Sequence, residues 1–129
     1  MEAVQFVKNI WHNANTELLA IENPVGWLNN NWRKPDQVFH PYFFGDPESK
    51  RTCLWLKNLP NLVRTHYRVK PKIYGYFETG KQAGHPIYFH SALIAHPERA
   101  LLRAQTFPGV AKKIAEQWGQ FMDFWYGIK

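Results

Sequence analysis

The sequence predicts a mixed α/β domain in which a small sheet containing an antiparallel hairpin is flanked by helices. Three observations predict this fold class: a helical stripe of apolar residues near the start, a buried apolar run that stops at Glu22, and two β-rich segments separated by a turn signal. The 129 residues are enough for one hydrophobic core and leave no room for a second. We therefore expect a single domain that spans residues 1–129.

The chain opens with a predicted helix and a predicted strand. Apolar side chains recur at helical spacing through residues 2–14, which predicts a helix with one apolar face. Residues 17–22 follow as a short buried strand. Pro24 ends this strand because it has no N–H to donate, and Gly26 permits a tight turn. One or two helical turns are expected within residues 25–32.

Two further segments predict an antiparallel hairpin. Residues 36–44 and 51–57 are rich in β-branched and aromatic residues, and a turn signal separates them by a loop of about five residues. Pro41 places an edge or a bulge inside the first of these strands. In the second strand, alternation places Thr52 and Leu54 on one face and Cys53 on the other.

The second half of the chain is harder to interpret. Residues 73–77 and 87–89 predict two more short strands joined by a loop. Residues 97–105 predict a helix with Pro97 in its first turn. Thr106 is expected to cap a final helix that continues to Trp125, because apolar side chains recur there every three or four residues.

The charge balance leaves two interpretations open. Sixteen Lys and Arg against ten Asp and Glu give a formal net charge of +6, which suits nucleic acid or an acidic protein, and equally a solvated basic face. Basic residues also alternate with other residues between positions 64 and 72. If this segment is extended, they share one face and are candidates to contact a nucleic-acid backbone: Arg64, His66, Arg68, Lys70 and Lys72.

Other classes of function are disfavoured by composition. Cys53 is the single cysteine, so there is no intramolecular disulfide and no multi-cysteine zinc site, and we expect a buried, inert thiol in a cytoplasmic (host-cell) protein. No two of the six histidines have metal-ligand spacing on a predicted helix, so no metal is expected. No apolar stretch reaches the roughly 20 residues of a membrane span, and the N-terminus does not resemble a secretory signal.

The strongest candidate site begins where the buried strand stops, at Glu22 and Asn23. Ligands collect at strand carboxyl ends in open α/β sheets. Arg51 lies further along the chain, after a polar segment that we expect to form a supporting loop. The residues of this loop are Arg33, Lys34, Asp36, Gln37 and Lys50. In one interpretation Glu22 pairs with Arg33 or Arg51 and braces the loop. In the other, the carboxyl group binds a polar heterocycle, such as the N3 and exocyclic amine of cytosine.

Several stretches together resemble a group of phage and prophage proteins that are related to DNA cytosine-5 methyltransferases. The similarity covers about residues 1–62 and 104–119, and the combination is more specific than any one part. The stretches that carry it are Ile21-Glu22-Asn23-Pro24-Val25-Gly26, Arg33-Lys34-Pro35-Asp36-Gln37, Phe44-Gly45-Asp46-Pro47, Lys50-Arg51-Thr52-Cys53-Leu54-Trp55-Leu56-Lys57-Asn58-Leu59-Pro60, Thr106-Phe107-Pro108-Gly109-Val110-Ala111 and Ala115-Glu116-Gln117-Trp118-Gly119.

The resemblance implies a truncated methyltransferase-like sheet and roles for particular residues. Glu22 and Asn23 match the family's Glu-Asn motif, whose glutamate holds the target cytosine. Arg51 matches a basic strand residue near the same base, and Pro108-Gly109 matches the motif that closes the cofactor site. The family's glycine-rich segment for S-adenosylmethionine and its Pro-Cys loop have no counterpart here. Cys53 lies after the Glu-Asn motif and does not match the catalytic cysteine.

Two functions follow from this resemblance. The first is a non-catalytic, DNA-binding module without a cofactor, which acts on nucleic acid or on a protein that handles it. In a phage, such a module suits an inhibitor of host defence, directed at restriction or at a CRISPR complex. The second is the C-terminal half of a split cytosine-5 methyltransferase, which would use S-adenosylmethionine once a partner chain completes it. In both cases we expect a homodimer or an obligate partner, because a truncated sheet exposes an edge.

Overall fold

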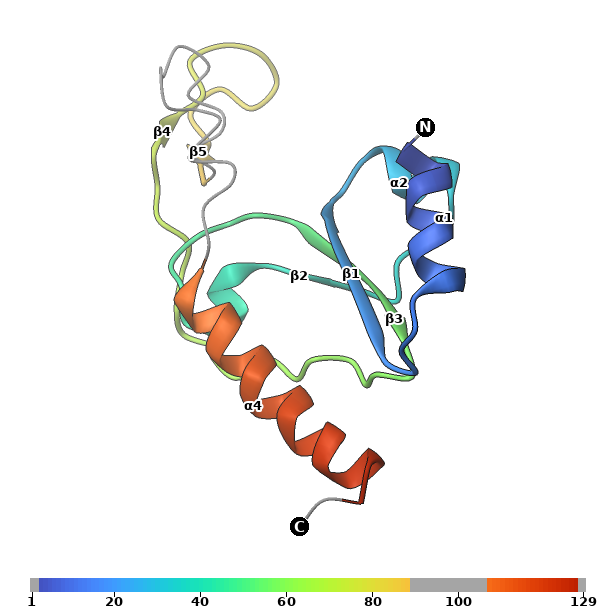
Figure 1. Cartoon of the computed structure of the whole chain (residues 1–129). Helices are drawn as coiled ribbons and strands as arrows, with labels where there is room; N and C mark the ends of the chain where they lie inside the picture. Colours follow the sequence, from blue (N-terminus) through green and yellow to red (C-terminus); the bar gives the residue numbers. More distant parts are fainter. Residues whose placement is uncertain (1–2, 89–106, 128–129) are drawn as a thin grey trace. The chain divides into compact units, whose positions relative to one another are not determined.

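A computed structural model describes residues 3–88 and 107–127 of the chain. Its contacts divide the chain into two compact units. Unit 1 comprises Met1–Phe39, Arg51–Val63 and Glu116–Lys129, and unit 2 comprises His40–Lys50 and Arg64–Ala115. Helices and small antiparallel sheets make this a mixed α/β protein, as the sequence predicts (Figure 1).

Unit 1 is built on a three-stranded sheet with the order β1-β3-β2. The strands are β1 (Leu19–Pro24), β2 (Gln37–Phe39) and β3 (Thr52–Lys57), and β3 runs antiparallel to both of its neighbours. Leu54 lies opposite Glu22 on one side and Gln37 on the other. The predicted antiparallel pairing of residues 36–44 and 51–57 is confirmed, but the expected loop of about five residues is wrong, because residues 40–51 connect the two strands. β1 and β2 form the sheet edges.

Two helices cover one face of this sheet, α1 (Ala3–Asn13) and α2 (Trp27–Asn31) (Figure 1). The buried core on that face consists of Leu28, Cys53 and Trp55, and partly buried apolar residues pack around it: Val4, Val7, Trp11, Ile21, Trp32 and Val38. Both helices were expected, α1 from the apolar stripe of residues 2–14 and α2 within residues 25–32. The side chain of Asn29 accepts a hydrogen bond from the Gly26 N–H (3.1 Å) and so closes the first turn of α2.

The segment after β3 lies along the other face of the sheet, where Leu54 and Phe39 are buried. The Gln37 side chain donates to the Leu62 carbonyl and accepts from the Leu62 N–H, both at 2.7 Å. From the second half of α4 (Pro108–Trp125), the Trp118 indole donates to the Pro60 carbonyl at 2.9 Å. These bonds fix an irregular segment against the sheet without a further strand.

Unit 2 contains a 3₁₀ helix η1 (Pro41–Phe44), the two-stranded antiparallel sheet of β4 (Gly75–Tyr76) and β5 (Pro86–Ile87), and the first turns of α4. The Asp46 carboxylate accepts hydrogen bonds from the N–H groups of Gly109 (3.0 Å) and Val110 (2.9 Å). Asp46 thus caps α4, where a carboxylate also suits the helix dipole. A Cβ at Gly109 would lie 2.6 Å from the Phe44 carbonyl oxygen, so this close approach requires glycine.

Several predicted elements need correction. The strand expected over residues 36–44 ends at Phe39, because Pro41 starts η1 instead of a bulge. The strands expected over residues 73–77 and 87–89 shrink to β4 and β5. The predicted helix over residues 97–105 and the cap Thr106 lie outside the described residues. No helix in the described part of the chain is long and apolar enough to cross a membrane.

Candidate nucleic-acid interface

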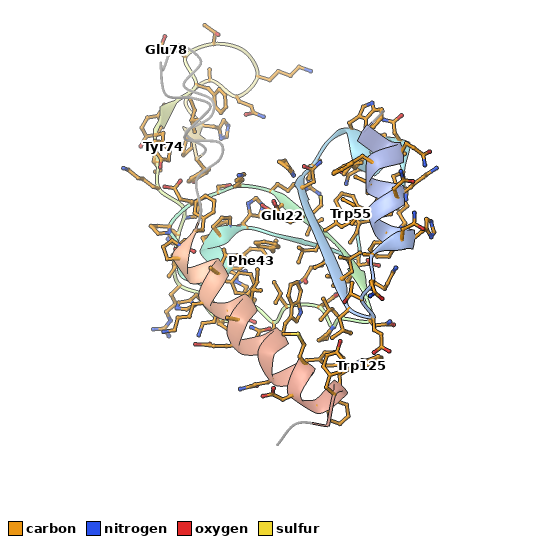
Figure 2. The ribbon with its side chains drawn as sticks, in the orientation of Figure 1. Glu22, Phe43, Trp55, Tyr74, Glu78 and Trp125 are labelled. Atoms are coloured by element: carbon orange, nitrogen blue, oxygen red, sulfur yellow. The ribbon has the colours of Figure 1, made fainter. Side chains whose placement is uncertain are left out.

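Glu22 is the exposed acidic residue of β1 (Figure 2). It lies opposite the buried Leu54, so its side chain shares the sheet face that carries Leu54 and Gln37. Among the residues that the structure describes, no hydrogen bond or ion pair reaches its carboxylate. The bracing interpretation, in which Glu22 pairs with Arg33 or Arg51, is therefore wrong: Arg33 pairs with Asp36.

Asn23 lies on the opposite face of the strand from Glu22. Its partner across the sheet is Cys53, which is completely buried, so the expected buried thiol is confirmed. The Asn29 side-chain nitrogen lies 3.5 Å from Cys53 Sγ. Arg51 is exposed just before β3, and its carbonyl accepts from the Val25 N–H at 3.4 Å. The Glu-Asn pair therefore does not converge on one point.

The residues expected to form a supporting loop are mostly engaged in holding unit 1 together. The Arg33 guanidinium lies over the rings of Trp11 (4.5 Å) and Trp32 (5.1 Å), and a 3.6 Å ion pair joins it to Asp36. Asp36 also accepts from the Leu56 N–H at 2.7 Å and so extends the pairing of β2 with β3. With Gln37 bound to the segment after β3, these polar side chains have structural roles.

The two lysines of that predicted set differ in their surroundings. Lys34 is exposed in unit 1. Lys50 belongs to unit 2, where its Nζ lies 5.8 Å from the centre of the Phe107 ring. The polar segment from Arg33 to Arg51 is therefore divided between two units, and it forms no single site within either of them.

Residues 64–72, which we call the basic segment, form no strand and bend at residues 67–68, so the extended backbone that would place all five basic side chains on one face is not present. Arg64 and His66 are half-buried, whereas Arg68, Lys70 and Lys72 are exposed. At its start, the N–H groups of residues 65 and 66 both bond to the Phe43 carbonyl, at 3.2 and 3.0 Å.

Aromatic rings beside the basic segment were missed as site residues. The Arg64 guanidinium carbon lies 4.3 Å from the Phe43 ring centre, 4.8 Å from that of Tyr67 and 5.6 Å from that of Tyr42. Tyr67 remains 72% exposed. The sequence contains one indication of these rings, because Tyr67 lies between Arg64 and Arg68. An argument from the alternation of basic residues alone does not take Tyr67 into account.

Tyr74 and Glu48 form a polar pair in unit 2. The Tyr74 hydroxyl donates a hydrogen bond to Glu48 Oε1. Burial and, secondarily, the Glu48 carboxylate raise the pKa of Tyr74 from 10.0 to about 12. Tyr74 is therefore a neutral donor near neutral pH, and its bond holds the turn that carries Glu48.

The described residues contain no group of three or more His, Cys, Asp or Glu side chains that could hold a metal ion. In comparisons with known proteins, no protein-family model, curated protein or solved structure matches the chain.

Proposed function

We propose that this chain is a non-catalytic nucleic-acid-binding module of the cytosine-5 methyltransferase-like kind, in which the Glu22 carboxyl group holds an unpaired cytosine. The observation that carries the proposal is the exposed Glu22 carboxylate, which has no partner among the described residues. The sheet is consistent with the proposal, because the strand that carries Glu22 and Asn23 lies beside an antiparallel hairpin.

The chemistry of a carboxyl group suits the edge of cytosine. One carboxyl oxygen accepts a hydrogen bond from the exocyclic amine, while the other shares a proton with the ring N3. Uracil presents an N–H and a carbonyl at these positions, so a carboxylate can accept from the N–H but meets the carbonyl with a second acceptor. Recognition requires an unpaired base, because base pairing occupies this edge in a duplex.

The test measures binding of short fluorescent poly-dC and poly-dU strands by fluorescence anisotropy. We expect the full chain to prefer poly-dC, and the variant Glu22→Ala to lose roughly 10- to 100-fold in poly-dC affinity, as expected for a hydrogen bond to a charged group. Asp123→Asn is the matched control, because Asp123 is an exposed acidic residue of the same unit. Its affinity is expected to equal that of the wild type.

A conservative variant separates base recognition from general charge effects. The Glu22→Gln side chain carries one acceptor and one donor, so it matches cytosine without a shared proton. Because the amide can rotate and present the same two groups to the N–H and carbonyl of uracil, we expect Glu22→Gln to bind poly-dC and poly-dU about equally, so the preference for poly-dC is lost. Equal affinity of the wild type for the two strands would overturn the proposal.

The alternative of a split methyltransferase half makes a different prediction for the methyl donor. We expect calorimetry of the chain with S-adenosylmethionine to show no binding. Measurable binding would favour the split enzyme. Failure of every oligonucleotide to bind would instead direct the search to a protein that handles nucleic acid, including components of host defence.

A further inference from the structure

We infer that the basic segment, residues 64–72 of unit 2, is a stacking platform for single-stranded nucleic acid, with Tyr67 as the ring on which a base stacks. This inference rests on the proposed function, because it names the form of nucleic acid that the module binds. It uses residues of unit 2 alone and is independent of Glu22.

The backbone of the basic segment is fixed at both ends. Its first residues bond to the Phe43 carbonyl, and at its end the Lys72 N–H donates to the Pro47 carbonyl at 2.9 Å. The His66 ring packs against Gly45, where a Cβ would lie 3.2 Å from the ring, and Gly45 has a positive φ of 103°. An irregular segment held in this way loses little conformational freedom when a ligand binds.

Arg64 supports the ring of Tyr67 from one side. Its guanidinium lies over the rings of Tyr67 and Phe43, and its Nε donates to the His66 carbonyl at 2.8 Å. Although Arg64 lies against its ring, Tyr67 is still 72% exposed. A supported aromatic ring with an open face is what a stacked base requires.

The charge around this ring is positive. Residues 64–77 contain four Lys or Arg and no Asp or Glu, and Arg68, Lys70 and Lys72 are exposed. The acidic residues of the adjoining turn are engaged elsewhere: Asp46 caps α4, and Glu48 accepts from Tyr74. The four Lys and Arg of residues 64–77 outnumber the two carboxylates of that turn.

A single strand fits this surface better than a duplex. Base faces are available for stacking only when the bases are unstacked from one another. The basic segment is neither a helix nor a two-stranded ribbon, which are the elements that enter a major groove. Interleaved aromatic and basic side chains are the usual components of sites that bind single strands without sequence preference.

The experiment measures binding of fluorescent poly-dT and of a duplex of the same length to the full chain. Poly-dT is chosen because thymine does not match Glu22. We expect tighter binding of poly-dT than of the duplex, and a loss of about 5- to 150-fold for Tyr67→Ala, which corresponds to about one stacked base. Tyr67→Phe retains a ring and is expected to bind within about twofold of the wild type.

Two further variants test the components of the site. Arg68→Ala combined with Lys70→Ala is expected to reduce the steepness of the salt dependence by about 1.4, because each phosphate contact to a single strand contributes about 0.7. Tyr126→Ala is the control, since Tyr126 is an exposed tyrosine of unit 1 (53% exposed). It is expected to bind poly-dT as the wild type does.

The outcomes separate this inference from the proposed function. Unchanged poly-dT affinity in Tyr67→Ala, or equal binding of duplex and single strand, would overturn the stacking platform. If Glu22→Ala still loses its preference for poly-dC in that case, the proposed function stands without the platform. If neither poly-dC nor poly-dT binds, both are wrong, and an acidic protein becomes the ligand that this surface suits.

Discussion

Arginine lies against aromatic rings in both units, but the rings differ in what covers them. In unit 1, Arg33 lies over Trp11 and Trp32, and these rings lead into the core: the centres of Trp11 and Trp32 are 5.4 Å apart, and those of Trp32 and Trp55 are 5.6 Å apart. Trp55 is completely buried. Arg33 therefore packs on the exposed side of a cluster formed by Trp11, Trp32 and Trp55, which we call the tryptophan cluster and which stabilises the fold.

In unit 2, the corresponding arrangement ends at the surface. Arg64 lies over Phe43 and Tyr67, and Tyr67 is largely exposed beside further basic residues. No acidic residue follows Arg64 until Glu78, whereas Arg33 has its ion pair with Asp36. The same combination of residue types therefore leads into the buried core in one unit and leaves an exposed ring in the other. Burial of the ring and the presence of a counter-ion decide between the two roles.

The largest expected effect is on stability in the tryptophan cluster. Trp55→Ala removes a completely buried ring and its indole bond to the Arg33 carbonyl (2.9 Å). We expect the free energy of unfolding to fall by about 3–5 kcal/mol, measured by urea denaturation. Tyr67→Ala is expected to change it by no more than about 0.5 kcal/mol, because the ring is exposed. If Trp55→Ala and Tyr67→Ala lowered the free energy of unfolding equally, the distinction between a buried structural ring and an exposed ring would be contradicted.

The two arginines provide a smaller and more direct comparison. Arg33→Ala loses its contacts with Trp11 and Trp32 and a partly exposed ion pair, so we expect a loss of about 1 kcal/mol in stability. Its affinity for poly-dT is expected to stay unchanged. Arg64→Ala is expected to weaken poly-dT binding several-fold because Tyr67 loses its support. A binding defect in Arg33→Ala would contradict the assignment of a structural role.

The last comparison is between two tyrosines of unit 2: the Tyr74 hydroxyl is hydrogen-bonded to Glu48, whereas the Tyr67 ring is exposed. The Tyr74 pKa of about 12 exceeds the ordinary value of 10.0, so the folded state keeps its proton longer than the unfolded state does. The stabilisation is therefore fully present below about pH 10 and is lost as pH rises to about 12. Tyr74→Phe should lack this decrease in the free energy of unfolding.

A second variant identifies the cause of that pH dependence. Glu48→Gln removes the carboxylate charge that helps to raise the pKa of Tyr74. We expect it to reduce the alkaline decrease in stability without abolishing it, because burial is the larger cause. Urea denaturation of the three proteins between about pH 9 and pH 12 makes the comparison, and identical curves for wild type and Tyr74→Phe would contradict the assignment.

Much of unit 1 could be predicted from the sequence, because its signals are local. The apolar stripe of residues 2–14 and the alternation in residues 51–57 are set by backbone periodicity, and they gave α1 and β3. Pro24 marked the end of β1, which stops at this residue. In each case the information lies within a few neighbouring residues.

The role of each polar side chain was decided by the tertiary structure. Arg33, Asp36 and Gln37 looked like parts of a site, and each has a structural partner far away in the sequence or in the tryptophan cluster. Asp46 gained its role as a cap from Gly109, which is 63 residues away. Such pairings depend on how distant segments meet, which no local pattern encodes.

The sequence by itself determined the mixed α/β class, the antiparallel pair beside the Glu22 strand, and the buried position of Cys53. Only the tertiary structure decided that Glu22 has no partner among the described residues, and that Tyr67 presents an open ring on Arg64. The physical reason is that periodicity reports which face of an element is apolar. It does not report which polar groups find a counter-ion or a covering side chain.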